Sequence, residues 1–168
     1  MSCSVISNTA ARSGKSKIDA CALLTSKEIE SVEGEPLKET KPSPKFGGFF
    51  AVSQCNFILP TSSNSIGLAV MQKADDSAAP DPKQFWKQTF HGDKEKEKGR
   101  GGEEAKLAPP ENIAGVGDEA FWLENRVGGQ LYVLKGDSYI VISAGSTGDR
   151  ADKIKRLKDL AQMVLKRL

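Results

Sequence analysis

Three cysteines and one histidine carry the most distinctive chemistry in this 168-residue sequence. Cys21 lies in a segment with a helical pattern, and Cys55 lies in an apolar segment with a strand pattern. Thiolates act as nucleophiles and metal ligands, and two thiols can also join as a disulfide. Cys3 lies in a polar tail, and His91 lies where a helical pattern ends, so only Cys21 and Cys55 are expected to sit within a folded framework.

The polar residues do not form a recognisable catalytic or metal-binding pattern. A Ser–His–Asp or Cys–His system would have to use His91, and the end of a helix beside a glycine-rich charged segment holds a precise site poorly. Zinc sites usually take several Cys or His ligands at short spacing, which this sequence does not supply. The sequence pattern also identifies no pair of carboxylates suited to general acid–base catalysis. We therefore predict no catalytic residues, no metal and no cofactor, and we interpret His91 as a surface residue.

The segment from Ile18 to Gly34 is expected to place Cys21. Thr25 and Glu28 form a capping box for a short helix, which glycine ends at position 34. A strand is predicted from Phe49 to Leu59, and its period of two puts Cys55 on the same side as the strand's other apolar residues. If the first segment covers that side, the two thiols meet.

We favour a disulfide between Cys21 and Cys55 over two reduced, buried thiols, which remain the alternative. The bond would close a loop of about 34 residues and contribute roughly 3–4 kcal/mol by the chain-entropy relation. It would also place the protein outside the cytosol.

Residues 1–17 are small and polar and are predicted to be a flexible N-terminal tether. They contain no charged segment followed by an apolar one, so no signal peptide is expected within them. Cys3 is followed by a small residue and then by this tail, as in a mature bacterial lipoprotein. We predict lipid attachment at Cys3 and hence a membrane anchor; a free tail cysteine is the alternative.

The remaining patterns predict an α+β fold with an antiparallel sheet, a C-terminal three-strand meander and helices packed on the sheet. Residues 18–168 are expected to form a single domain with a mobile charged loop at about 93–108. The elements behind this prediction, in chain order, are a strand at 65–73, a helix from Asp81 to about Gly92, strands within 119–144 and a helix at 149–168.

Trp86 and Trp122 are candidates for the lining of a ligand pocket between helix and sheet. The alternative is that both tryptophans belong to the core, and the position of Trp86 on an apolar helix face favours that alternative.

The overall composition excludes some classes of partner. Hydrophobic residues make up 38% and charged residues 27% of the chain, and the formal net charge is +2. This charge and the lack of a basic motif argue against a nucleic-acid partner. The longest apolar runs are far shorter than the roughly 20 residues that span a bilayer, so we expect a soluble chain, and a monomer.

A wider pattern resembles a known family. It consists of Asp19 to Thr25 around Cys21, Glu28, Gly34, Cys55-Asn56-Phe57, Gly115 to Phe121, a glycine-containing hairpin, and a final helix with Ala161 and Leu168. This pattern resembles the cysteine-paired domains of bacterial cell-envelope lipoproteins of unknown function, and is similar to extracytoplasmic sensor domains of actinobacterial receptor kinases. The resemblance implies an α+β fold, an intramolecular disulfide, an envelope location and no established enzyme activity.

These observations together predict a non-enzymatic, extracytoplasmic, membrane-anchored domain that binds an unidentified small ligand or envelope protein. Two alternatives remain at this stage. One is a hydrolase that uses carboxylates in the helix–sheet cleft, and the other is a structural module of the envelope.

Overall fold

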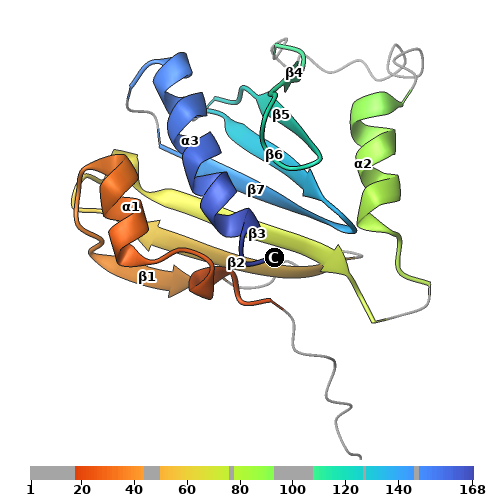
Figure 1. The fold of residues 1–168 in the computed structure, drawn as a ribbon, viewed down its shortest axis with the longest axis horizontal. Helices are drawn as coiled ribbons and strands as arrows, with labels where there is room; N and C mark the ends of the chain where they lie inside the picture. The colour runs from red at the N-terminus through yellow and green to blue at the C-terminus, as the bar shows by residue number, and fades with distance from the viewer. Residues whose placement is uncertain (1–17, 44–49, 76–77, 93–107, 127, 146–147) are drawn as a thin grey trace, which may run out of the picture.

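The computed structural model describes residues 18–43, 50–75, 78–92, 108–126, 128–145 and 148–168. Its elements, shown in Figure 1, are η1 (Ala20–Ala22), α1 (Ser26–Glu33), β1 (Glu39–Pro42), β2 (Phe50–Ile58), η2 (Ser62–Asn64), β3 (Ile66–Lys73), α2 (Pro82–His91), β4 (Glu111–Asn112), β5 (Glu119–Leu123), β6 (Gln130–Lys135), β7 (Ser138–Ala144) and α3 (Arg150–Leu165). The predicted α+β class is confirmed. The predicted tether at 1–17 and nearly all of the charged loop lie outside the described residues.

The strands form one antiparallel sheet in the order β1-β2-β3-β7-β6-β5-β4. The predicted meander is confirmed as β5, β6 and β7, and it joins the β2–β3 hairpin through pairing of β3 with β7. Gly136 has φ 58° in the two-residue turn between β6 and β7, the conformation that suits glycine there. β4 is too short and too polar to give a strand signal in the sequence, and it was not predicted.

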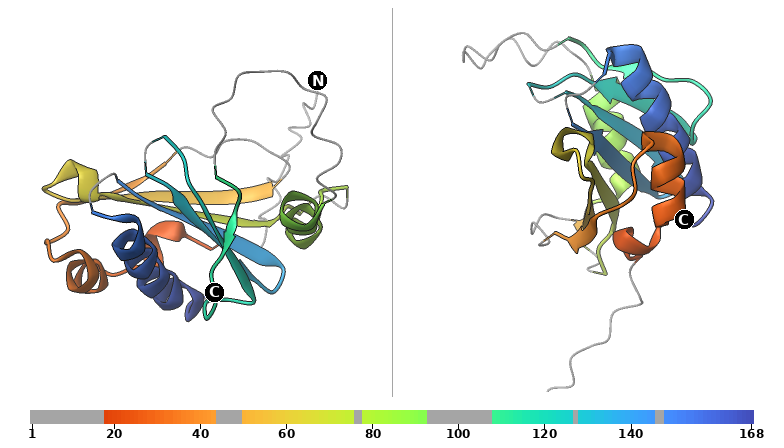
Figure 2. Two further views of the ribbon diagram at one scale, coloured as in Figure 1. Left: turned by 90° about the horizontal axis from the view of Figure 1, so that it is seen from above. Right: turned by 90° about the vertical axis from the view of Figure 1, so that its left-hand side faces the viewer.

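The two faces of the sheet are covered unequally. One face packs against η1, α1 and α3 around the main core, which includes Leu68, Ile140 and Leu160. On the other face, α2 packs against β3 and β7 and encloses a smaller aromatic cluster around Trp86 and Phe121, to which β5 and β6 also contribute side chains. Figure 2 shows α1 and α3 on one side of the strands and α2 on the other. α2 is the one described helix on its face, and it covers only part of that face.

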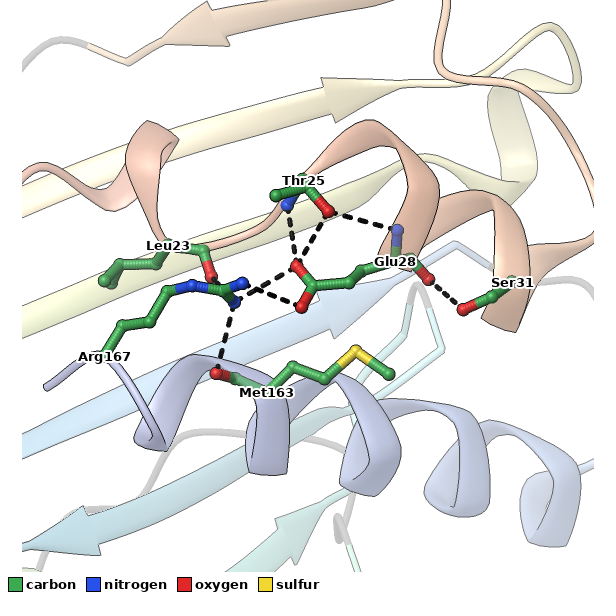
Figure 3. A network of polar contacts seen from close by, with 6 residues as sticks. All are labelled: Leu23, Thr25, Glu28, Ser31, Met163 and Arg167. Carbon is green, nitrogen blue, oxygen red and sulfur yellow. Dashed lines mark hydrogen bonds and ion pairs between the residues drawn. The ribbon is translucent and has the colours of Figure 1, made fainter.

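The capping box predicted at the start of α1 is present and is tied to the C-terminal end of the chain (Figure 3). The Thr25 hydroxyl accepts from the backbone N–H of Glu28, whose carboxylate accepts from the Thr25 backbone N–H at 2.9 Å. Arg167, just after α3, donates to the same carboxylate at 2.9 Å and to the Leu23 carbonyl at 3.0 Å. The hydrogen bond from Arg167, with those from Thr25, lowers the pKa of Glu28 despite the opposing effect of burial. The first and last helices are thus joined beside η1, which carries Cys21.

The helix α2 begins as predicted, with Asp81 as its N-cap and proline at the first position. Trp86 faces the sheet and is 1% exposed. The neighbouring Phe85 is 44% exposed. One residue along a helix turns the side chain by about 100°, so Phe85 points to the rim of the helix and shares that stripe with Thr89 four residues later.

Candidate ligand-binding groove

A groove of about 430 Å³ lies on the sheet face that carries α2, within the range of about 300–1,000 Å³ typical of ligand pockets. We call it the open-face groove. Its lining contains no charged side chain among the described residues and consists of Ser43, Gln54, Asn56, Gly67, Leu68, Ala69, Met71, Phe85, Thr89, Phe90, Leu123, Gln130, Tyr132, Tyr139, Val141 and Ser143.

The floor of the groove consists of alternate residues from neighbouring central strands. Strand side chains alternate between faces, so Gly67 and Met71 of β3 face the groove while Leu68 packs in the main core. A Cβ atom on Gly67 would lie 2.7 Å from the Ser143 Oγ atom. The lack of a side chain at Gly67 therefore makes the groove deeper where β3 pairs with β7.

The groove continues toward the start of β3. An adjoining cavity of about 290 Å³ shares Asn56, Gly67, Gln130 and Ser143 with it. The same four residues thus lie at the junction of two hollows, and the open surface is longer than the first hollow alone.

Several polar groups in the groove keep hydrogen-bonding capacity. The Gln54 side-chain amide and the Ser143 hydroxyl make no hydrogen bond to another described residue, and Gln130 uses only its Oε1 atom, which accepts from the Tyr132 hydroxyl at 3.2 Å. Asn56 donates to the Ser43 hydroxyl at 2.6 Å and retains its Oδ1 atom as an acceptor. These amides and hydroxyls can serve a bound molecule as both donors and acceptors.

The two tyrosines of the groove remain neutral over the physiological pH range. Burial raises the pKa of Tyr132. Burial, together with the nearby Tyr132, raises the pKa of Tyr139 to about 12. The lining therefore presents phenolic O–H groups and no phenolate.

A carboxylate on the sheet holds the helical wall of the groove. Glu119 of β5 accepts from the Trp86 indole N–H at 2.5 Å and contacts the His91 Nε2 atom at 2.8 Å. Burial acts to raise the pKa of Glu119, but the hydrogen bonds from His91 and Trp86 and the His91 charge together lower it. We call Glu119, Trp86 and His91 the α2 latch, since they attach both the middle and the end of α2 to the sheet.

The sequence did not reveal the α2 latch. His91 was interpreted as a surface residue, and its side chain is indeed 50% exposed, but it is paired with a carboxylate. The two residues are 28 positions apart, so no local pattern connects them. The signal that was available is the position of Glu119 on the same strand face as Phe121, which faces α2.

The predicted disulfide is confirmed. Cys21 and Cys55 are joined by an S–S bond of 2.07 Å, with their Cα atoms 5.1 Å apart. Cys55 is 1% exposed within the main core, so the bond attaches the segment before α1 to the centre of β2. A disulfide is consistent with an extracytoplasmic location. Cys3, the predicted lipid-attachment residue, lies outside the described residues.

The tryptophans predicted to line one pocket do not do so. Trp86 and Trp122 are each 1% exposed and belong to different clusters on opposite faces of the sheet. Trp122 and Phe121 are adjacent on β5 and therefore point to opposite faces, with Phe121 beside Trp86. The alternative interpretation, that both tryptophans are core residues, is the one that the structure supports.

No protein-family model matches this chain, and comparisons with curated proteins and with solved structures also give no match. In the part of the chain that the structure describes, no helix is both long and apolar enough to cross a membrane. The same residues contain no group of three or more His, Cys, Asp or Glu side chains placed to hold a metal ion.

Proposed function

We propose that this protein is a non-enzymatic, extracytoplasmic binding domain of the bacterial cell envelope, tethered to a membrane through Cys3, that holds a small ligand in the open-face groove. One observation carries this proposal. A hollow beside α2 on one face of the sheet has aromatic walls, and the Gln54 amide and the Ser143 hydroxyl in it make no hydrogen bond to another described residue. Concave sites with apolar walls and a few convergent polar groups are typical of ligand binding.

The envelope location draws support from the disulfide and from the resemblance of the cysteine pattern to envelope lipoproteins. The hydrolase alternative needs carboxylates that converge in a helix–sheet cleft. Glu119, the carboxylate next to α2, already bonds two side chains of the α2 latch, and no carboxylate of the described residues lines the groove. No specific observation favours that alternative.

The binding part of the proposal is tested by NMR on the full chain. A 15N-labelled sample is titrated with uncharged small molecules of three classes: neutral sugars, acetylated dipeptide amides and monoacylglycerols. The expected result is that at least one class shifts the amide signals of Asn56, Gly67 and Ser143 without shifting those of α3. If all three classes leave these signals unchanged, the groove is not a ligand site.

A groove-filling variant supplies the control. Gly67→Val adds bulk to the floor, and the backbone at this position allows a side chain once the Ser143 hydroxyl rotates. It is expected to abolish the shifts, whereas Ala151→Val on the exposed surface of α3 is expected to leave them unchanged. If the protein is a purely structural envelope module, no ligand will shift the amide signals of the groove residues in either the wild type or Gly67→Val.

The tether is tested separately by mass spectrometry of the protein expressed with its natural N-terminus. An acyl group on Cys3 is expected. Its absence would contradict the lipid anchor while leaving the groove proposal in place.

A further inference from the structure

We infer that the ligand of the open-face groove is a neutral saccharide, an inference that rests on the proposed function. The starting observation is a contrast in charge. Charged residues make up 27% of the chain, yet the described lining of the groove contains none. Three amide side chains, those of Gln54, Asn56 and Gln130, stand where charged residues are common on an open sheet face.

A charged ligand does not fit this lining. Moving a charge out of water is costly unless an opposite charge or several hydrogen bonds compensate for it. The described lining supplies no opposite charge, and Tyr132 and Tyr139 stay as neutral phenols. The described lining therefore offers no ion-pair partner to a carboxylate, a phosphate or an amine.

A long acyl chain does not fit it either. Such a chain would cover Gln54, Gln130 and Ser143 without offering them a donor or an acceptor. Each buried polar group left unpaired costs free energy that an apolar contact does not return. The free amide and hydroxyl groups would then weaken binding instead of strengthening it.

An extended peptide is a poor match for a different reason. Peptides that bind to sheets usually add as a strand at an edge, where backbone groups are unpaired. The groove instead crosses the face of β2, β3, β7 and β6, strands with neighbours on both sides. Their backbone N–H and C=O groups are already used in the sheet, so recognition depends on side chains.

A saccharide matches both parts of the lining. Each sugar hydroxyl is a donor and an acceptor, as are the side-chain amides of Gln54 and Gln130. The C–H face of a pyranose ring can pack on an aromatic ring, and Phe85 is the one large apolar side chain among the described residues that is prominently exposed, at 44%. The adjoining cavity that shares Asn56 suits a second sugar unit.

The experiment screens the full chain against an array of neutral mono- to tetrasaccharides and their carboxylated counterparts. Array hits are then titrated in solution by NMR and calorimetry. We expect binding to neutral members only, and an affinity that changes less than twofold between 50 and about 500 mM salt, because no ion pair is screened.

Matched variants locate the binding. Gln54→Ala and Phe85→Ala are each expected to weaken the affinity about tenfold, in line with the loss of a central contact. Gln162→Ala removes the same chemical group from the exposed surface of α3, on the opposite face, and is expected to leave the affinity unchanged. Folding of every variant is checked by its unfolding midpoint.

The outcomes separate this inference from the proposed function. If no neutral glycan binds but the dipeptide amides or monoacylglycerols shift the groove signals, the saccharide assignment is overturned and the binding function stands. If glycans bind but Gln54→Ala and Phe85→Ala have no effect, the assignment is likewise overturned. If no class shifts the groove signals, both fail.

Discussion

Replacing Glu119 by alanine is expected to destabilise the protein by about 2–3 kcal/mol. The Trp86 indole N–H donates to this carboxylate, and Trp86 is 1% exposed. Without Glu119 the indole N–H stays buried with no acceptor, which costs roughly 1–3 kcal/mol. The contact with His91 adds less, because its side chain is half exposed and exposed pairs contribute about 1 kcal/mol or less.

Two further variants separate the contributions of Trp86 and His91 to this loss of stability. Glu119→Gln keeps an oxygen acceptor for the indole and is expected to cost about 1 kcal/mol, close to a single net hydrogen bond. His91→Ala removes only the exposed partner and is expected to cost less than 1 kcal/mol. Urea unfolding followed by both circular dichroism and tryptophan fluorescence gives the free energies and checks that the two probes coincide.

The pH dependence provides an independent test. The folded-state pKa of Glu119 is lowered, so the unfolded state binds a proton more readily at acid pH. The stability that the Glu119 charge contributes is therefore present above the ordinary carboxyl pKa of about 4.3 and lost as the pH falls through the lower folded value. The difference between wild type and Glu119→Gln should shrink over that acid range. If Glu119→Ala costs no more than His91→Ala, the assignment of the main contribution to the buried indole is wrong.

Three further predictions concern the framework. The double variant Cys21→Ala, Cys55→Ala should lower the free energy of unfolding by about 4 kcal/mol for a loop with a sequence separation of 34, and reduced wild type should unfold at the same urea concentration as the variant. Arg167→Met should cost about 1 kcal/mol in thermal unfolding at neutral pH, and less at high salt, because its ion pair is partly exposed. Gly129→Ala should lower the free energy of unfolding by about 2 kcal/mol or more, because φ is 112° at this position and a Cβ atom would collide with the Trp122 indole ring. Gly136→Ala has open space around its Cβ atom and should lower the free energy of unfolding by about half as much in the same urea assay.

The parts of the fold that follow from the sequence are those with local signals. The capping box of Thr25 and Glu28 needs only four residues, and the period of two in β2 identifies the face of Cys55. The alternation in β3 likewise separates Leu68 from Gly67. Pairing of β3 with β7 joins segments about 70 residues apart, and no local pattern specifies it. For the same reason, the position of Glu119 on its strand face does not by itself specify a contact with α2.

The open-face groove shows a different limit of sequence reasoning. Polar residues that alternate with apolar ones along a strand indicate a solvent face, and the pattern is the same whether that face is flat or hollowed. A sheet of seven strands is about 29 Å wide, whereas α2, with ten residues, is about 15 Å long and 10 Å across. α2 alone therefore covers only part of the face on which it packs. Phe85 and Thr89 of α2 lie at the border of the covered part and line the open-face groove together with residues of the neighbouring strands.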